Sequence, residues 1–411
     1  MTETWEAVQK HSRSVAGVSV AALGFSLPIS TSLDGILLVI TVIAWAISGA
    51  YRDLSRLVRG NRLILLLPGL FVVIALGMVH GMVPFGVRAK YLWKHDDLLL
   101  PLVFVPLLAD VTVRERALWA FGAGMTLTLL ISLCLATGLI PKSSWFHGET
   151  ANATVFKLQI THNILMAVTA LLFAEVAVGC RVSWQRYVLG LLAFGAVIDV
   201  FMLVQGRTGQ IVLGLLILLW CERRLGWRGV TAGVVVVAAL LVMSFSLSPV
   251  FQKRVEKTVT EIQQSKVDVV APEASSVGLR LEWYKNTARL VTTHPLVGVG
   301  TGSFAEAYRE MVTEPNAVKP AHPHNQYLLT ASDLGIGGVG VLLGVFGWLW
   351  WWFRSECGHL YSQLGQGVVI TMAVGCVFNS FLIDHTEGLF FAWMVSAALA
   401  TNPGEEGGHP C

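Results

Sequence analysis

The strongest constraint on this chain is a series of apolar runs, separated by polar connections, that covers most of its length. A helix needs about 20 mostly apolar residues to cross a bilayer, and somewhat fewer where its ends kink or snorkel. Twelve runs suit this requirement, near residues 15–32, 34–50, 63–80, 92–109, 117–139, 159–178, 187–204, 210–221, 229–247, 326–352, 363–383 and 388–401. We therefore predict an all-α polytopic membrane protein with about twelve transmembrane helices.

The composition agrees with a membrane protein. Of the 411 residues, 54% are hydrophobic and 13% are charged, whereas charged residues make up about 25% of a typical soluble domain. The 14 tryptophans and 40 glycines suit aromatic belts and close packing of membrane helices. The net charge of +3 is too small to indicate a nucleic-acid partner. The polar stretch before the first apolar run predicts a retained span rather than a cleaved signal peptide.

Basic residues gather in every second connection, and this asymmetry predicts the orientation. Those on one side are Lys10, Arg13, Arg52, Arg56, Arg59, Arg62, Arg114, Arg116, Arg181, Arg186, Arg223, Arg224, Arg228 and Arg354. The positive-inside rule places this side, with both termini, in the cytoplasm. We expect transmembrane helices 1–9 in residues 1–247, an outer loop with amphipathic helices in 248–325, and helices 10–12 with a cytoplasmic tail in 326–411.

A single arginine, Arg207, stands in the very short hinge "VQGRTGQ" between two apolar runs. Arginines at such depth are costly and usually face a cavity or a partner. The adjacent Gly206 and Gly209 allow a ligand and backbone amides to approach closely, and the following helix adds its positive dipole end. We interpret Arg207 as an anion-binding residue, the alternative being snorkelling to lipid headgroups.

Another basic group stands at a second entrance on the same face, in "FGVRAKYLWKHDDLLL". Arg88 is a candidate for substrate binding, by the same argument as Arg207. Lys94 followed by Asp96 or Asp97 suits an ion pair at the start of a helix. The functional and structural interpretations therefore both stay open here.

The long outer segment contains two helical patterns. In residues 248–264, Val255, Val259 and Ile262 share one face, as in a helix that lies along the membrane surface. The later stretch "PLVGVGTGSF" is a glycine-rich turn. It lacks the terminal Lys-Ser/Thr of a P-loop and follows no strand pattern, so it gives little support to nucleotide binding.

The second helical pattern covers residues 277–295. Leu281, Tyr284, Ala288 and Val291 recur at helical spacing and predict an apolar stripe. Arg280 does not lie on this stripe. Arginines on amphipathic helices are mostly solvated, so periodicity by itself gives Arg280 no role.

Two histidines and an asparagine directly precede the tenth apolar run, in "AHPHNQYLL". One interpretation is a helix cap, with a polar side chain such as that of Asn325 satisfying free amides. A metal site needs at least one further ligand, so His322 and His324 form a poor zinc signature. The third is a histidine that exchanges a proton near pH 7, beside an anion bound by Arg207 and Arg280.

The chain resembles the O-antigen ligase and polymerase superfamily in the order of three motifs, "GRTGQ", "GLRLEWYKNTARLVTTHPLVGVGTGSF" and "HPHNQYLLTASDLGIGG". The closing "FNSFLIDHTEGLFFAWMVSAALA" is similar to the C-terminal part of that family. The resemblance covers roughly residues 155–400. It implies a glycosyltransferase of the GT-C type that works at the periplasmic face of a bacterial inner membrane. Such enzymes invert the anomeric centre and use no metal ion or other cofactor.

The resemblance also implies substrates and roles. The donor is a glycan on undecaprenyl pyrophosphate, and the ligase acceptor is a sugar hydroxyl of lipid A–core, in lipopolysaccharide biosynthesis among membrane lipids. The family's two functional arginines and loop histidine correspond to Arg207, Arg280 and His324, the last preferred over His322 because it precedes the asparagine. The guanidinium groups stabilise charge on the departing pyrophosphate, and His324 takes the acceptor's proton.

Other polar residues are expected near the substrates. Arg88, Asn325 and Asp384 are candidates for contacts with the pyrophosphate or the acceptor. Asp384 and its neighbour His385 are also rival bases, although an aspartate at a helix end is commonly a cap. His162 either lines the cavity or is a satisfied interior histidine.

Several functions remain as alternatives. An O-antigen polymerase or a protein O-oligosaccharyltransferase shares these motifs, and the twelve-span plan with one long loop before the tenth span favours the ligase. A lipid-linked glycan transporter belongs to a different class. A transporter is expected to carry polar residues through the midplane, whereas those of this chain gather at one face.

Overall fold

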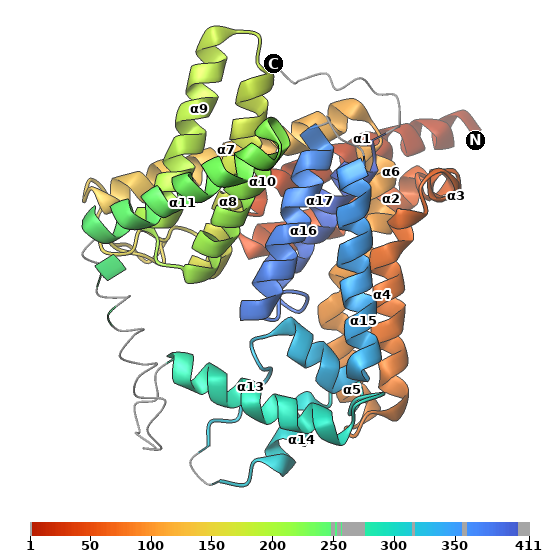
Figure 1. Cartoon of the computed structure of the whole chain (residues 1–411). Coiled ribbons are helices and arrows are strands. Elements are labelled where there is room, and N and C mark those ends of the chain that lie inside the picture. Colours follow the sequence, from red (N-terminus) through yellow and green to blue (C-terminus); the bar gives the residue numbers. More distant parts are fainter. Residues whose placement is uncertain are drawn as a thin grey trace.

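The computed structural model describes residues 2–247, 251–252, 256, 276–314, 317–355 and 360–401. Helices dominate this part of the chain, and within it the only β-type pairing is an isolated bridge between Glu149 and Asn152. Figure 1 shows the helices gathered in a bundle, with α13 running across one end of it. The prediction of an all-α protein is confirmed.

The described helices follow one another along the chain with short connections. They are α1 (Thr2–Ser26), α2 (Thr31–Ser48), α3 (Tyr51–Gly60), η1 (Arg62–Leu65), α4 (Leu66–Leu76), η2 (Gly77–His80), α5 (Phe85–Leu92), η3 (Trp93–Leu99), α6 (Pro101–Leu108), α7 (Val111–Ala136), α8 (Gln159–Gly179), α9 (Ser183–Ile198), η4 (Asp199–Leu203), α10 (Arg207–Leu225), α11 (Trp227–Leu247), α13 (Ser276–Thr293), α14 (Phe304–Met311), α15 (Gln326–Ser355), α16 (Leu360–Phe378) and α17 (His385–Leu399). Of the short elements, η4 is a π-helix and the other three are 3₁₀-helices.

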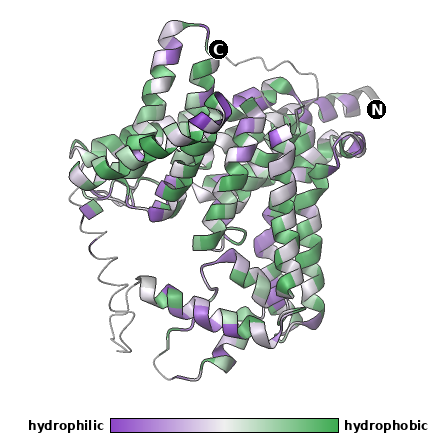
Figure 2. Ribbon diagram, in the orientation of Figure 1, coloured by the Kyte–Doolittle hydropathy of each residue, from purple (hydrophilic) through white to green (hydrophobic). Residues whose placement is uncertain are grey.

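Long apolar helices make this a multi-pass membrane protein. Within the described residues, eight segments are long and apolar enough to cross a membrane: Thr31–Ser48, Arg62–His80, Val111–Ala136, Gln159–Gly179, Ser183–Leu203, Trp227–Leu247, Gln326–Ser355 and Leu360–Phe378. The other four expected runs lie on α1, η3 with α6, α10 and α17. Figure 2 shows hydrophobic residues over most of the bundle and hydrophilic ones on α3 and parts of α13. The count of twelve spans stays a prediction.

The contacts of Arg223 show which helix ends lie together at one end of the bundle. Its guanidinium donates to the Gln366 side chain at 2.8 Å and to the Phe353 carbonyl at 3.3 Å. The end of α10 therefore meets the start of α16 and the end of α15. Because a helix rises about 1.5 Å per residue, the opposite end holds the start of α10, the start of α15 and the end of α16. We call it the histidine end, because His324 precedes α15 there.

The glycine-rich turn packs against a kink in α15. Gly335 interrupts this helix with φ 69°, and the Gly300 amide donates to the Asp333 carbonyl at 3.0 Å. Gly300 has φ 91°, and a Cβ there would lie 2.4 Å from Cα of Gly81. The glycines of this turn thus permit a left-handed backbone and close chain packing.

The predicted apolar stripe of α13 is wrong at two of its four positions, since Tyr284 and Val291 are half-buried but the other two are not. Leu281 is 49% exposed and Ala288 is also exposed, whereas Thr287 and Leu290 are buried. The buried face packs on α14 and α15, and it includes Asn286, whose amide donates to the Tyr308 hydroxyl at 3.1 Å. Hydrophobic spacing missed this face because polar side chains occupy part of it. The expected surface helix near 248–264 lies almost wholly outside the described residues, as does the tail after Thr401.

Candidate active site

Three segments meet around His324 at the histidine end. The Tyr284 hydroxyl on α13 donates to the carbonyl of His324 at 3.0 Å and to that of Val377 on α16 at 3.1 Å. The Asn325 side-chain amide donates to the same Val377 carbonyl at 3.0 Å. These bonds hold the segment before α15 against the end of α16, with α13 alongside.

Asn325 is engaged within the fold by both ends of its amide. Besides the bond to Val377, its Oδ1 accepts from the Leu328 backbone amide at 3.0 Å. This is the contact by which a capping side chain satisfies a free amide at a helix start. The cap interpretation describes Asn325 well, so any contact with a substrate would compete with these bonds.

The His324 imidazole is held by Trp283 and Asn379, and the His322 ring lies beside it with centroids 4.3 Å apart. The His324 ring stacks on Trp283 of α13, with centroids 5.3 Å apart and an interplanar angle of 23°. Its Nδ1 lies 2.9 Å from Oδ1 of Asn379, and Nδ2 of Asn379 donates to Oδ2 of Asp384 at 2.6 Å. Nε2 makes no hydrogen bond with any residue in the described ranges. One ring nitrogen is thus committed and the other is available.

His324 also adopts an unusual backbone conformation. Its φ of 53° is the only positive value among the described residues other than glycine. The left-handed region costs an ordinary L-residue on the order of 1 kcal/mol. Such strain persists where the surroundings impose it and is concentrated at functional sites. Here the Tyr284 bond to the His324 carbonyl and the stack on Trp283 impose it.

Burial and charge keep both histidines neutral near pH 7. Burial, with smaller contributions from the neighbouring His324 and the charge of Lys94, lowers the pKa of His322 to about 4. Burial also lowers the pKa of His324; the bond to Asn379 opposes this shift, and the charge of Arg280 adds to it. A neutral imidazole has a lone pair on one ring nitrogen, so His324 suits a base.

Asp384 completes the same group of side chains. Burial raises its pKa to about 6, against the charge of Lys94 and the hydrogen bond from Asn379. The carboxyl group is therefore mostly ionised at pH 7 but closer to neutrality than an exposed aspartate. The neighbouring His385, which the sequence suggested as a rival base, has its Nδ1 3.7 Å from Oδ2 of Asp97.

Two cations flank this group. The charge of Arg280 affects the pKa of Tyr284 and of His324. The charge of Lys94 affects the pKa of His322 and of Asp384. Lys94 lies with its ammonium 5.9 Å from the centroid of the Tyr91 ring. The suggested ion pair of Lys94 with Asp96 or Asp97 is not formed within the described residues. The site therefore combines a neutral histidine with positive charge on two sides, an arrangement that suits an anionic substrate.

Arg207 lies at the same end of the bundle but outside this group. It is the first residue of α10 and is exposed. It makes no hydrogen bond or ion pair with another residue of the described part. The hinge before it is fixed, since the Gln205 backbone amide donates to Asn152 Oδ1 at 2.9 Å. Its guanidinium is available to a ligand or to lipid headgroups, so both predicted roles stay open.

Gly206 and Gly209, beside Arg207, allow α8 to pack closely against the start of α10. A Cβ on Gly206 would lie 2.3 Å from Nδ2 of Asn163, and one on Gly209 would lie 2.3 Å from Cβ of Asn163. The Asn163 amide also donates to the Val204 carbonyl at 3.4 Å. Packing of α8 against α10 therefore accounts for these glycines, where the sequence suggested the approach of a ligand.

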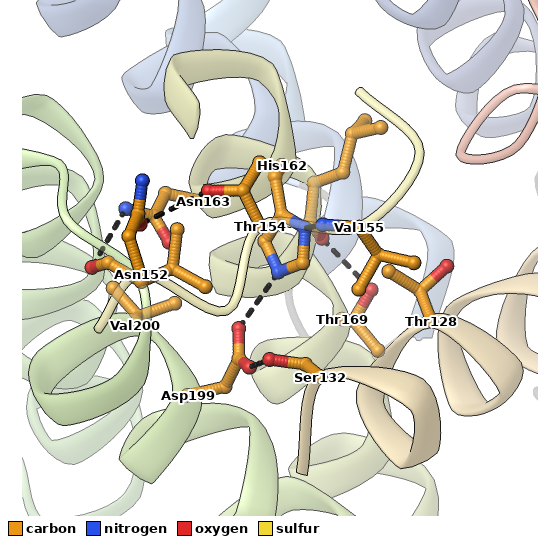
Figure 3. A network of polar contacts seen from close by, with 12 residues as sticks. Thr128, Ser132, Asn152, Thr154, Val155, His162, Asn163, Thr169, Asp199 and Val200 are labelled. Carbon is orange, nitrogen blue, oxygen red and sulfur yellow. Dashed lines mark hydrogen bonds and ion pairs between the residues drawn. The ribbon is translucent and has the colours of Figure 1, made fainter. Parts of the chain in front are cut away.

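His162 belongs to a separate, fully buried network (Figure 3). Its Nε2 lies 2.9 Å from Oδ2 of Asp199, and its Nδ1 accepts from the Val155 backbone amide at 3.4 Å. The Ser132 hydroxyl donates to the other Asp199 oxygen. Both ring nitrogens are occupied and the side chain is 1% exposed. His162 is thus a satisfied interior histidine that joins α8 to η4 and to the preceding loop.

Arg88 is half-buried on α5 and binds the protein's own backbone. Its guanidinium donates to the Met78 carbonyl, and it lies 5.9 Å from the centroid of the Phe85 ring. Its Cα and side chain pack near Gly302 and Gly81 of the turn region. This contact ties α5 to η2, and substrate binding by Arg88 stays a prediction.

Comparison with known families identifies part of the chain. The family model described as O-antigen ligase matches residues 189–343. Over these residues the chain is similar to an O-antigen ligase domain. A search of curated proteins finds no match to the chain. The predicted resemblance is confirmed, and it supports a membrane glycosyltransferase of the O-antigen ligase and polymerase superfamily. The matched residues include Arg207, Arg280, His324 and Asn325, but end before Asn379.

The sequence did not single out Trp283 and Asn379, and it offered Lys94 only as part of a basic group or of an ion pair. Trp283 and Lys94 carry no motif that separates them from interfacial aromatic or basic residues. Asn379 lies in "FNSFLIDH", beyond the matched residues and 55 positions after His324. A signal did exist, because "NSFLID" places Asn379 and Asp384 around a turn at the end of an apolar run. Their orientation toward His324 depends on how α16 packs, which the sequence does not display.

Proposed function

We propose that this protein transfers a glycan from undecaprenyl pyrophosphate to a sugar hydroxyl of lipid A–core at the periplasmic face of a bacterial inner membrane. The observation that carries the proposal is the surroundings of His324, a neutral imidazole with an available nitrogen beside Arg280. The orientation is supported by the bundle itself, since arginines gather at the end opposite His324. That asymmetry agrees with a cytoplasmic arginine end.

The proposed reaction is a single displacement with inversion at the anomeric carbon. The acceptor oxygen forms a bond to that carbon while the bond from the carbon to the pyrophosphate oxygen breaks. The bonding electrons leave with the pyrophosphate, and the hydroxyl proton passes to His324. General base catalysis of this kind contributes about 10²- to 10⁴-fold to a rate.

The arginines are assigned to the departing pyrophosphate. Arginine remains charged and matches phosphate oxygens with two parallel N–H bonds. Arg280 lies near His324, and Arg207 presents an uncommitted guanidinium at the same end of the bundle. We propose that they stabilise the negative charge that develops on the leaving group, so that no metal ion is required. Arg88 and Asp384 are proposed to border the substrates.

The same site suits other acceptors. A growing glycan chain as acceptor would make the protein a polymerase, and a protein hydroxyl would make it a protein O-oligosaccharyltransferase. The plan with one long loop before α15 favours the ligase among these three. Transport of a lipid-linked glycan is a different class of function, and it would give no role to an available histidine nitrogen.

The test is a transfer assay with purified protein in lipid. Undecaprenyl pyrophosphate-linked glycan and lipid A–core are incubated with wild type and with His324→Ala, in the presence of EDTA. We expect glycosylated lipid A–core from wild type and at least about 100-fold less from the variant. Loss of activity in EDTA that added magnesium restores would contradict the metal-independent mechanism.

Other outcomes would redirect the proposal. Chain extension or protein glycosylation from the same donor, without transfer to lipid A–core, would retain the site and replace the acceptor. No consumption of donor by folded wild type with any of these acceptors would exclude the transferase and favour transport.

A further inference from the structure

We propose that Asn379 is a positioning residue that fixes the tautomer of His324, so that Nδ1 carries the hydrogen and Nε2 faces the acceptor as the base. The proposal rests on the transferase function above and deepens it. Its evidence is a chain of three side chains, in which Nδ1 of His324 lies 2.9 Å from Oδ1 of Asn379 and Nδ2 of Asn379 lies 2.6 Å from Oδ2 of Asp384.

The direction of this chain follows from the chemistry of its members. An ionised carboxylate only accepts hydrogen bonds, whereas a primary amide donates through nitrogen and accepts through oxygen. Asp384 therefore turns the nitrogen of Asn379 toward itself and the oxygen toward His324. An oxygen facing Nδ1 requires a hydrogen on Nδ1. In a neutral imidazole the other nitrogen then has the lone pair.

The surrounding turn holds Asn379 in place. It is the residue after α16, and its backbone amide donates to the Gly375 carbonyl at 3.0 Å. The turn folds back on α16, where a Cβ on Gly375 would lie 1.8 Å from the Phe381 ring. The Leu382 amide donates to Oε1 of Gln326 at 3.1 Å. This packing fixes the distance between α16 and the start of α15, and with it the distance from Asn379 to His324.

The arrangement has a consequence for pH. The charge of Lys94 on η3 acts on Asp384, and the charge of Asp384 acts in turn on Glu387 of α17 and Cys376 of α16. When Asp384 takes a proton it can donate, so the Asn379 amide is free to reverse and to donate to His324 Nδ1. The reversed amide would favour the opposite tautomer, with its lone pair on Nδ1. Activity is then expected to fall as Asp384 becomes protonated.

The direct test is the nitrogen chemical shift of the His324 ring in protein labelled with ¹⁵N-histidine, which does not depend on turnover. The resonances of His324 are identified by their absence in His324→Gln. We expect the Nδ1–H tautomer at pH 7.5 in wild type and a mixture of tautomers in Asn379→Leu. A wild-type protein with the hydrogen on Nε2 would overturn the proposal, whatever its activity.

The kinetic test compares two asparagines, the half-buried Asn379 and the buried Asn286. Asn379→Leu removes the partner of His324, while Asn286→Leu removes the amide bond to Tyr308 on α13 and leaves His324 untouched. We expect Asn379→Leu to lower kcat about 100-fold with KM nearly unchanged, and Asn286→Leu to lower it less than about threefold at a similar loss of thermal stability. Equal effects of both variants on kcat would reduce Asn379 to a structural residue.

A conservative variant keeps the proposal testable if Asn379→Leu does not fold. Asn379→Asp still offers an acceptor to Nδ1–H, and its added negative charge raises the pKa of His324. We expect kcat within about tenfold of wild type and an acid limb of the pH profile that moves to higher pH. An unchanged acid limb would contradict contact between residue 379 and the base. If wild type showed the Nδ1–H tautomer but transferred no glycan to any of the acceptors, the proposed function would fail while the tautomer set by Asn379 would stand. If His324→Ala remained active, the role of His324 as the base would fail, and with it the catalytic part of this inference.

Discussion

His162 and His324 both have a carboxylate nearby, and they differ in what the second ring nitrogen does. His162 binds Asp199 directly at 2.9 Å and accepts from the Val155 amide with its other nitrogen. His324 reaches its carboxylate through Asn379 and leaves Nε2 without a partner among the described residues. A histidine with both nitrogens occupied connects parts of a fold. One with a free nitrogen is able to act on a substrate.

Their electrostatic surroundings differ in the same sense. Asp199 is buried beside His162 and receives the Ser132 hydroxyl as well, so the carboxylate is satisfied within the network. At His324 an amide separates the imidazole from Asp384, while Arg280 and Lys94 supply positive charge around the group. The comparison indicates that a nearby carboxylate is not sufficient evidence for catalysis. The available nitrogen and the adjoining cations are what distinguish His324.

The largest expected effect separates chemistry from stability. His324→Ala should lower the transfer rate by about 10²- to 10⁴-fold, the usual contribution of a general base, with little change in Tm. His162→Ala should instead lower Tm, because loss of one partner of a buried pair costs about 3–5 kcal/mol. Transfer assays and thermal unfolding of both variants check this. A large loss of rate in folded His162→Ala with normal Tm would reverse the assignment.

The next prediction tests the proposed phosphate contacts of Arg207 and Arg280. Arg207→Lys and Arg280→Lys retain charge but lose the paired N–H geometry, so each should lower kcat about 10- to 100-fold if two-pronged phosphate contact is what matters. Arg186 in the first turn of α9 provides a matched control, since its guanidinium donates to the Cys180 carbonyl at 2.7 Å. The measurement is kcat from steady-state kinetics of the Arg207, Arg280 and Arg186 lysine variants. Near-normal turnover by Arg207→Lys would leave snorkelling as the explanation for that residue.

The sequence predicted the architecture well because hydrophobic length is a local property. Each of the twelve expected runs lies on a helix, and the prediction of helices in a membrane needed no tertiary information. The predicted stripe of α13 wrongly included Leu281 and Ala288. The buried face contains Asn286 and Thr287, and hydrophobic spacing does not count polar residues. Burial of such residues depends on partners such as Tyr308, which are remote in sequence.

The candidate site was predictable only in part, for a similar reason. His324 and Arg280 each belong to a motif of the resemblance, which marked both as candidates, and the structure places them near each other. Asn379 and Lys94 reach the site from other helices, and no local pattern marks their side chains. The role of Gly206 and Gly209 was misjudged because a glycine permits close approach without specifying whether a ligand or Asn163 approaches.

A smaller effect concerns the pH profile. A base acts when neutral, so activity should fall as pH drops through the pKa of His324, which burial and then Arg280 hold below its ordinary value. Removing the charge in Arg280→Gln should raise that pKa and move the acid limb to higher pH. The rate against pH between about 4.5 and 8 measures the shift. His162→Gln, which leaves the charge around His324 unaltered, should leave the limb in place, and a shift there would contradict the separation of the two regions.

The smallest effect isolates the backbone of the two histidines. His324 has φ 53°, where glycine is favoured over alanine, whereas His162 lies inside α8, where alanine is favoured by about 1 kcal/mol. His324→Gly should therefore be more stable than His324→Ala, and His162→Gly less stable than His162→Ala, each by about 1 kcal/mol. Both members of a pair lose the same imidazole, so the difference in their unfolding midpoints reports backbone conformation alone. Alanine proving the more stable substitution at both positions would show that the left-handed backbone at 324 is not retained once the ring is removed, and that the stack on Trp283 and the bond to Asn379 are what impose it.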